Sequence, residues 1–361
     1  MSMRVIEEEI NEEPEDVGDK QRYTTTINGV QTTVDAIEMR RYSLTQSFYD
    51  NLQFEDSFEI DPDQLAINKN MLLGQGRFTE VYKGEMTQWG ETLNVAVKVL
   101  KEGLDSETEQ MKRNILTVDL LIMYGLQKSG GHPNVLRLAG AITTIPNEFY
   151  VITEYCNLGS LAQFLQEKNS EGLFENELIL EENEQDPESR KQTWKSVQEW
   201  AWKDGFHSRR ENKQITTSDL LWFALQIARA MHFLTEKKIY THGVALRNVL
   251  LKSDFTLKVA EFGLSHSLCE TDDDCQMMKD NMASSVRYMA PEMLATLECT
   301  TSSECWSFGI ALWELFTFAA HEPYSKEMEN AASDGSLWSR MESFLKAGGR
   351  LVIPNTIPEN L

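Results

Sequence analysis

Basic side chains are scarce in this sequence of 361 residues, where 34 Lys and Arg stand against 57 Asp and Glu, for a formal net charge of −23. That charge disfavours binding to nucleic-acid phosphates or to an anionic membrane surface. No apolar run reaches the roughly 18 residues that a membrane-spanning helix needs. The N-terminal MSMRVIEEEI becomes acidic where a signal peptide would be apolar. We therefore expect no nucleic-acid partner, no membrane-spanning segment in this chain and a cytoplasmic location.

Cysteine is also scarce, and no C-x-x-C pair occurs among the five cysteines, which are Cys156, Cys269, Cys275, Cys299 and Cys305. An odd and scattered set of this kind is typical of free thiols in a reducing compartment. A hydrophobic content of 41% and eight tryptophans nevertheless indicate a folded protein with a real core.

The residue pattern changes along the chain. Residues 1–57 begin with the acidic EEEINEEPEDVGD, continue as a polar, Thr-rich stretch and are expected to be largely disordered. Strand patterns then fill 58–155, in LAINKNMLLG, EVYKGEM, LNVAVKVL and FYVITEYC, with a helix expected over 107–126. Helices at 218–234 and 305–320 dominate 156–361, and a charged, aliphatic-poor insert interrupts this part at about 167–216. A strand-rich half followed by a helix-rich half predicts a two-lobed α+β fold.

The stretch LLGQGRFTEVYKG carries a G-x-G at Gly74 and Gly76 on a predicted strand-turn-strand. Glycines there let backbone N–H groups approach phosphates closely, although an ordinary hairpin gives the same pattern. VAVK follows on the next strand, and its Lys98 is placed to reach α- and β-phosphates. The two motifs together indicate nucleotide binding more specifically than either alone.

Three further segments follow in order: THGVALRNVLL (241–251), KVAEFGLS (258–265) and RYMAPEML, and then the helix SSECWSFGIALWELFT. With the glycine loop and VAVK, this series resembles the protein kinase family, and Ala245-Leu246-Arg247-Asn248 resembles the tyrosine-kinase group. EYCNLGSLAQFL and the insert after it resemble receptor tyrosine kinases with a split kinase domain, of the platelet-derived and vascular endothelial growth factor receptor type. TQSFYDNLQFEDSFEIDPDQLAI is similar to the juxtamembrane segment of those receptors.

The resemblance implies an ATP site between two lobes. Lys98 is then the phosphate-binding lysine, and counting back from HPNVLRLAG places Asp119 at its paired acid, one methylene shorter than the usual glutamate. It also implies an adenine roof, floor and hinge, with Thr153 at the gatekeeper position, although plain core packing would use the same apolar residues. The residues implied for ATP binding are Gly74, Gly76, Val81, Ala96, Lys98, Thr153, Glu154, Cys156 and Leu250.

The sequence also departs from the family pattern at several specific motif residues. The family's catalytic aspartate, which accepts the proton of the substrate hydroxyl, is missing. A gapless alignment places Gly243 at its position; alternatively His242 is the motif histidine and the aspartate is deleted. Asn248 is kept as a metal-binding residue, but Glu261 replaces the D-F-G aspartate, so ATP remains the expected cofactor while Mg²⁺ is in doubt. Thr79 replaces the third glycine of the loop.

Regulation and function follow from the same resemblance. The activation-loop segment LSHSLCETDDDCQMMKDNMASSV has no tyrosine, and Glu304 replaces the aspartate that braces the catalytic loop. Three readings compete: a nucleotide-binding, allosteric or scaffold partner without catalysis; a low-activity ATP-dependent protein tyrosine kinase; and a non-functional product, because PNTIPENL stops before the last two helices of the fold. Expected partners are an active protein kinase or receptor and phosphotyrosine-reading adaptors. If the chain is a fragment, its place is the cytoplasmic side of a plasma-membrane receptor.

Overall fold

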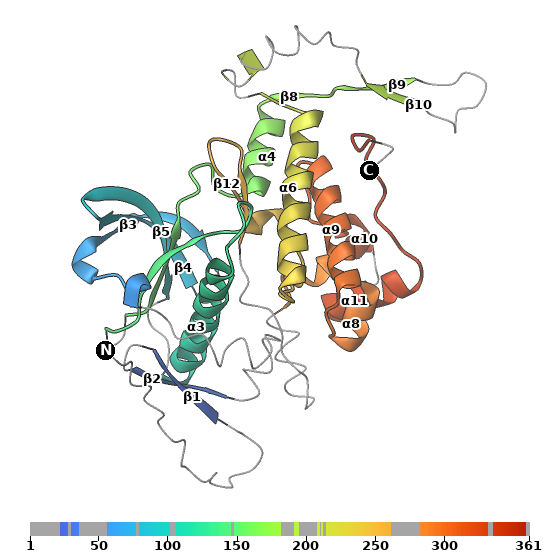
Figure 1. Cartoon of the computed structure of the whole chain (residues 1–361). Helices are drawn as coiled ribbons and strands as arrows, with labels where there is room; N and C mark the ends of the chain where they lie inside the picture. Colours follow the sequence, from blue (N-terminus) through green and yellow to red (C-terminus); the bar gives the residue numbers. More distant parts are fainter. Residues whose placement is uncertain are drawn as a thin grey trace.

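The computed structural model describes residues 22–27, 30–35, 56–76, 79–101, 106–145, 148–181, 191–194, 208–209, 211, 214–260, 282–330 and 335–358. A strand-rich lobe and a helical lobe follow one another along the chain (Figure 1). The two-lobed α+β fold expected from the sequence is therefore confirmed.

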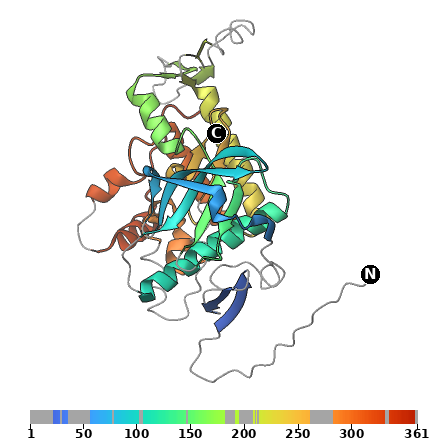
Figure 2. The ribbon, with the colours of Figure 1, turned by 90° about the vertical axis from the view of Figure 1, so that its left-hand side faces the viewer.

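The first lobe is built on a five-stranded sheet with strand order β3-β4-β5-β7-β6, in which every neighbouring pair is antiparallel. β5 is buried on both faces of the sheet where Val95 and Val97 point to one side and Ala96 to the other. Helix α3 lies beside the sheet and contacts β6 (Figure 2). The element bounds are β3 Leu65–Gln75, β4 Thr79–Gln88, β5 Glu91–Leu100, α3 Ser106–Lys128, β6 Leu138–Ile142 and β7 Tyr150–Glu154.

The second lobe centres on α6, Thr217–Glu236, which packs on α9, Thr301–Phe316. Both helices begin at a capping box, Thr216 with Asp219 and Thr300 with Ser303, which satisfies N–H groups that the first turn leaves open. One apolar core runs from α3 through α6 to α9 and so joins the lobes. The remaining bounds are α4 Leu161–Ser170, β12 Val249–Leu251, β13 Leu257–Val259, α8 Pro291–Thr296, α10 Ser325–Asn330 and α11 Leu337–Lys346.

The chain enters and leaves the predicted insert through neighbouring segments at the end of α4 and the start of α6. Helix α4 continues to Ser170, past the expected start at 167, because Leu161 and Leu165 are fully buried and Lys168 is largely so. Two short strands then pair in parallel, β8 Phe174–Glu175 with β11 Ile215–Thr216. The chain between them contributes the antiparallel pair β9 Leu178–Glu181 and β10 Lys191–Trp194.

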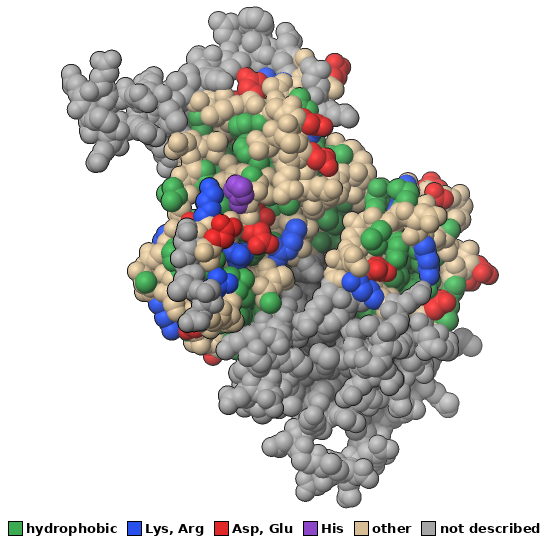
Figure 3. All heavy atoms as spheres, turned by 180° about the vertical axis from the view of Figure 1, so that it is seen from behind, with side chains coloured by type: hydrophobic (Ala, Val, Ile, Leu, Met, Phe, Trp, Pro, Cys, Tyr) green, Lys and Arg blue, Asp and Glu red, His purple; other side chains and the backbone are tan. Residues whose placement is uncertain are grey.

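Two other features complete the description. A hairpin of β1 Arg22–Ile27 and β2 Val30–Asp35 lies within the N-terminal 57 residues that were expected to be largely disordered. On the face seen in Figure 3, acidic and basic side chains are interspersed over the described part, which favours local ion pairs over an extended field of one sign.

Candidate active site

Lys98 and Asp119 are brought together from two elements. Lys98 lies on β5, where it pairs in register with Val81 of β4 and Val151 of β7. Its Nζ forms an ion pair with Oδ2 of Asp119 on α3, and the two side chains are 25% and 7% exposed. Among the described residues, the other carboxylate oxygen of Asp119 is buried without a hydrogen-bond donor. Asp119, although one methylene shorter than glutamate, therefore reaches Lys98, and its second carboxylate oxygen remains a buried acceptor.

The residues implied for the adenine lie around the junction of the lobes. Ala96 stands opposite Thr153 in the sheet, and both are 8% exposed. Leu250 on β12 forms an isolated bridge with Ser160, which ties the floor to the chain that links the lobes. The structure thus places Ala96 and Thr153 on neighbouring strands of the first lobe and Leu250 beside the chain that follows the last of these strands.

Glu154 is engaged more fully than the sequence predicted. Its backbone N–H donates to the carbonyl of Arg137 at 3.1 Å, so that group serves the fold, not an adenine. Its carboxylate accepts from the N–H of Arg137 at 3.0 Å and pairs with Lys258 at 2.8 Å and Lys252 at 3.5 Å. Burial raises the pKa of the neighbouring Cys156 thiol to about 12, which keeps it protonated and unreactive.

The glycine loop is closed by its own backbone. Gly74 lies opposite Val81 in the β3–β4 register. The N–H of Gly76 donates to the carbonyl of Thr79 at 2.8 Å. A Cβ placed on Gly76 would lie 3.0 Å from the Thr79 hydroxyl oxygen. Thr79 therefore fills space beside the glycine at the point where the family has another glycine.

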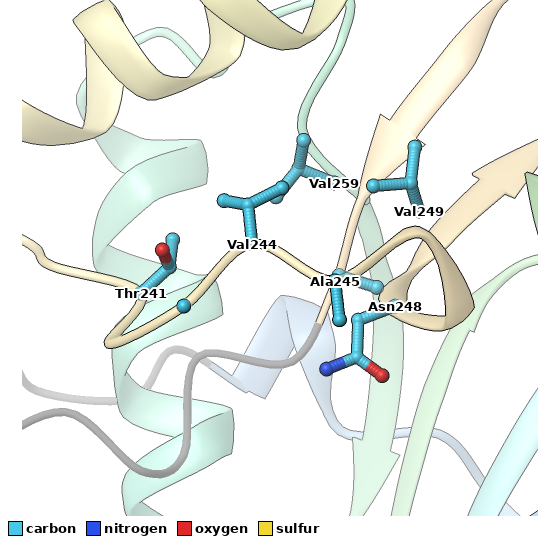
Figure 4. Close-up of a pocket in the computed structure, with 8 residues that line it drawn as sticks. Thr241, Val244, Ala245, Asn248, Val249 and Val259 are labelled. Atoms are coloured by element: carbon cyan, nitrogen blue, oxygen red, sulfur yellow. The ribbon is translucent and has the colours of Figure 1, made fainter. Parts of the chain in front are cut away.

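The catalytic-loop segment adopts a backbone that depends on glycine. His242 and Gly243 both have positive φ angles, +55° and +133°. A Cβ on Gly243 would lie 2.9 Å from Cβ of Tyr288 and 3.5 Å from Cβ of Ser285. A small cavity beside the loop is lined by Thr241, Gly243, Val244, Ala245, Asn248, Val249, Val259 and Ala260, with Asn248 pointing away from the valines (Figure 4). No carboxylate is among these lining residues.

Among the described residues, the carboxylates of Glu304 and Glu314 lie near the loop, and both accept hydrogen bonds from its backbone. Glu304 accepts from the N–H and hydroxyl of Thr241 at 3.1 and 2.8 Å, and from the N–H of His242 at 3.1 Å. Glu314 accepts from the N–H of Leu246 at 2.9 Å. Burial raises the pKa of both carboxyls above the ordinary value. Glu304 thus braces the loop despite its extra methylene relative to aspartate.

Glu314 and Ser307, whose hydroxyl accepts from the N–H of Val244 at 2.7 Å, were not predicted from the sequence. With Glu304 they share one face of α9 at spacings of three and seven residues. That polar stripe on an otherwise apolar helix is the signal that could have identified them. The activation segment adds a further contact, because Arg247 donates to the carbonyl of Ser284 at 2.8 Å.

The predicted metal site is only partly described. The N–H of Ala260 donates to the carbonyl of Asn248 at 2.9 Å, which brings the chain leading to residue 261 alongside the asparagine. Glu261 itself and the acidic run of the activation loop lie outside the described residues. Within the described part, no cluster of three or more His, Cys, Asp or Glu side chains is arranged to hold a metal ion.

A lysine–acid pair under a glycine hairpin, a gatekeeper strand and a buried helix bracing a T-H-G-x-x-x-x-N loop together define a protein-kinase domain. Residues 67–361 match the family described as protein tyrosine and serine/threonine kinase, and the chain belongs to that family. Its tyrosine-kinase-like character of the receptor type is borne out by its relatives.

Three relatives illustrate this. Vascular endothelial growth factor receptor 3 of Danio rerio is 29% identical over 293 residues, covering 76% of this chain and 20% of the relative. The receptor-like tyrosine-protein kinase kin-15 of Caenorhabditis elegans is 32% identical over 295 residues, 76% of this chain and 56% of the relative. Macrophage colony-stimulating factor 1 receptor 1 of Takifugu rubripes is 32% identical over 303 residues, 76% of this chain and 30% of the relative.

The chain therefore spans between a fifth and somewhat over half of the length of these relatives. Among the helices of the described residues, none combines the length and the apolar character that crossing a membrane requires.

Proposed function

We propose that this chain is a receptor-type tyrosine-kinase-like domain whose phosphoryl transfer is lost or severely impaired, and that it binds nucleotide and acts as an allosteric or scaffold partner of an active receptor kinase. One observation carries the proposal. Gly243, which takes the position of the catalytic acid in the gapless alignment, has φ +133° and no room for a side chain, because Cβ of Tyr288 is 2.9 Å from where its Cβ would be. The loop conformation therefore leaves no space for an acidic side chain at this position.

The neighbouring carboxylates do not replace the missing base. Glu304 and Glu314 are buried, at 4% and 6% exposure, and accept hydrogen bonds from loop amides. A general base must lie within hydrogen-bonding reach of the proton it removes. Losing the base alone lowers the rate by about 10²–10⁴-fold, and phosphoryl transfer depends even more on positioning and charge.

Nucleotide binding has separate support. Lys98 is oriented by its ion pair with Asp119, and its side chain remains 25% exposed, so its ammonium group is accessible to an anionic phosphate. Lys98 would hold the phosphates, and Ala96, Thr153 and Leu250 would enclose the base. Bound ATP would supply the phosphoryl group of any residual reaction. Asn248 is the single described residue of the expected metal pair, so a role for Mg²⁺ depends on Glu261.

A second candidate, a slow protein tyrosine kinase, is favoured by one specific observation. The ion pair of Lys98 with Asp119 is formed and Asn248 lies beside the strand that precedes Glu261, so part of the phosphate-positioning apparatus is in place. Positioning and electrostatics carry most of the catalysis of phosphoryl transfer.

The wider organisation belongs to the same proposal. Residues 1–57 form a juxtamembrane-like segment, 58–155 and 156–361 are the two kinase lobes, and the insert lies at about 167–216. The chain acts at the cytoplasmic side of a membrane receptor, with an active receptor kinase as hetero-partner and phosphotyrosine-reading adaptors as further partners. Support comes from the relatives, which are named as receptors and a receptor-like kinase.

The deciding experiment compares autophosphorylation and peptide phosphorylation by the purified chain with those of Lys98→Ala. Incorporation at the background level of Lys98→Ala, together with cooperative unfolding and a thermal shift with ATP, is the expected result. Phosphate incorporation that Lys98→Ala abolishes would favour the slow kinase. A chain that does not unfold cooperatively would contradict both candidates.

A further inference from the structure

We propose that Lys83 and Tyr155 form a latch across the mouth of the nucleotide site, which slows both the entry and the release of nucleotide. The inference rests on the proposed nucleotide-binding function and assigns to that site a barrier to ligand exchange. Lys83 lies on β4 in the first lobe, and Tyr155 is the first residue of the linking chain, residues 155–160, which joins β7 to α4. The ammonium nitrogen of Lys83 lies 5.4 Å from the centroid of the Tyr155 ring.

The strand register places Lys83 on the side of the sheet that faces the proposed site. Side chains alternate between the two faces of a strand, so Val81 and Lys83 share one face of β4. Val81 stands opposite Lys98 of β5, and Lys83 stands opposite Ala96. Residues directly opposite one another on neighbouring strands share a face. Because Lys98 reaches Asp119 of α3 from this face, Lys83 lies on the same side as the lysine–acid pair.

The same row of the sheet leads to Tyr155. Ala96 stands opposite Thr153 of β7, so Lys83, Ala96 and Thr153 form one row across neighbouring strands. Tyr155 follows Thr153 by two residues, the spacing that returns a side chain to the same side of an extended chain. Because the middle residue of the row is alanine, no bulky side chain separates the lysine from the ring. The contact therefore lies at the edge of the proposed adenine site.

The latch joins the two lobes. Glu154, the residue before Tyr155, forms an ion pair at 2.8 Å with Lys258 of β13, and these two side chains are 9% and 10% exposed. That buried pair attaches the start of the linking chain to the second lobe, whereas Lys83 belongs to the sheet of the first. A movement that separates the sheet from the linking chain must therefore break the contact between the ammonium group and the ring.

The surroundings of Lys83 allow the latch to open. Within the part of the chain that the structure describes, Lys83 forms no ion pair, although the exposed Glu85 lies two residues away on the same face of β4. A hollow of about 360 Å³ borders Lys83, with Asn68, Met71 and Glu85 among its lining residues. The lysine side chain can swing into this hollow without disturbing the strand pairing. Opening therefore requires the loss of one cation–π contact.

A latch makes a kinetic prediction that a ligand contact does not. Its two groups both belong to the chain, so it forms without nucleotide and must open for entry as well as for release. Breaking it should raise the association and dissociation rate constants by the same factor, roughly twofold to tenfold for a partly exposed cation–π contact. The Kd should then stay nearly unchanged. A lysine that touched the nucleotide directly would change the Kd instead.

The test measures association of mant-ATP by stopped flow, and its dissociation on addition of excess ATP, with the full chain and without metal. Lys83→Met keeps a long side chain and removes the charge, so both rate constants should rise by that factor. Tyr155→Leu should have the same effect, and combining the two changes should add nothing further. Lys83→Arg and Tyr155→Phe keep the cation and the ring, respectively, and should keep the rates of the unaltered chain.

Lys237→Met is the matched control. Lys237 also lies over an aromatic ring, that of Phe233, with its ammonium nitrogen 5.8 Å from the centroid, but this pair is at the end of α6 in the second lobe. The change removes the same charge and the same kind of contact. It should leave both rate constants unaltered.

Amide hydrogen exchange in the linking chain is a second readout, and it needs no nucleotide. Exchange in residues 155–160 should accelerate in Lys83→Met and Tyr155→Leu but not in Lys237→Met, because local opening then costs less free energy. Unchanged rate constants, equal effects of Lys237→Met, or a weaker Kd with an unchanged association rate would overturn the latch. If the unaltered chain does not bind mant-ATP, the proposed nucleotide site fails, and hydrogen exchange alone decides whether Lys83 and Tyr155 hold the lobes together.

Discussion

Gly243 and Tyr288 lie so close that a Cβ on the glycine would stand 2.9 Å from Cβ of the tyrosine. The tyrosine is 1% exposed, and burial raises the pKa of its phenol well above the usual range. Its ring also lies under the guanidinium of Arg247, 5.3 Å from the ring centroid. The residue that would have to move to admit a side chain at 243 is therefore itself firmly packed.

We expect that Gly243→Asp does not restore kinase activity. A side chain at φ +133° is strained and meets Tyr288, so the variant should lose roughly 1–3 kcal/mol of unfolding free energy. Gly243→Ala carries the same strain without the charge and is the matched control. Both should unfold at lower urea concentration, and neither should phosphorylate a peptide at an ordinary kinase rate.

The same assay is extended to Glu261→Asp and to the triple variant Gly243→Asp, Glu261→Asp and Thr79→Gly. Groups that act as one catalytic unit are strongly non-additive, so single repairs should each give little. Ordinary turnover by Gly243→Asp alone would show that the other departures are tolerated and would reduce the proposal to one missing side chain.

ATP binding should be weak and should not be strengthened by Mg²⁺. The lysine pair is formed, whereas Asn248 is the single described residue of the metal site. A ligand at 100 times its Kd stabilises a protein by about 2.7 kcal/mol, which thermal denaturation detects. Equal shifts with and without Mg²⁺ are expected, and Lys98→Ala should abolish both. A shift seen with Mg²⁺ or Mn²⁺ only would mean that Glu261 is a working metal ligand.

The lobes were predictable because their signals are local, and the lysine–acid pair because the resemblance to the kinase family supplied a position for each partner. Strand alternation, helical periodicity and the count from the HPNVLRLAG stretch need a few tens of residues at most, and the structure brings Lys98 to Asp119. Contacts between distant residues were not predictable in this way. Glu154 forms an ion pair with Lys258, about a hundred residues later in the chain, and the sequence around Glu154 gives no sign of this contact.

The conformation of the loop at Gly243 was likewise not predictable from the sequence. The sequence gives the identity of the residue but not its φ angle or the approach of Tyr288. Glu314 and Ser307 lie within the helix predicted over 305–320, but their hydrogen bonds to the loop join residues more than sixty positions apart and have no local signal. The end of α4 at Ser170, a few residues beyond the expected start of the insert, depends on the burial of Leu165 and Lys168 by tertiary packing.

The buried carboxyls Glu304 and Glu314 should make stability fall as pH rises. Their folded-state pKa values are raised by burial, so the folded chain binds more protons than the unfolded chain above the ordinary glutamate pKa. The stabilisation is fully present below that pKa and is lost as pH rises through the folded pKa. Urea unfolding across this interval should show a smaller slope for Glu304→Gln than for the unaltered chain.

Glu304→Gln should also cost roughly 1–3 kcal/mol at neutral pH, because an amide N–H₂ then faces a loop N–H. Glu298→Gln, at an exposed position before α9, is the control and should keep both the slope and the stability. An unchanged slope in Glu304→Gln would show that this carboxyl does not titrate with folding.

Phosphorylation by an active receptor kinase should fall on Tyr42 or Tyr49. Both lie outside the described residues, in a polar stretch near Asp50 and Glu55. Tyr124, Tyr288 and Tyr324 are each 1% exposed, and no tyrosine occurs in 167–216. Phosphopeptide mapping after co-expression with an active receptor kinase is the measurement, with Tyr42→Phe and Tyr49→Phe as controls. Modification confined to Tyr288 would contradict the expectation.

The insert should be removable without loss of the fold. Its ends are held together by the parallel pairing of β8 with β11, and the Glu177 carboxylate accepts from the N–H of Ser218 at 2.7 Å in the first turn of α6. A shortened connection between 181 and 214 therefore spans ends that the structure already fixes, and loop-closure entropy depends only weakly on length.

Limited proteolysis should cut first within the charged stretches 182–190 or 195–207 and leave two associated fragments. A deletion of 182–213 closed by a short Gly-Ser linker should change the melting temperature little, whereas Glu177→Ala should lower it by removing a carboxylate that caps the helix. Primary cleavage within 218–234, or failure of the deletion variant to fold, would mean that the insert supports α6 and is not an excursion from it.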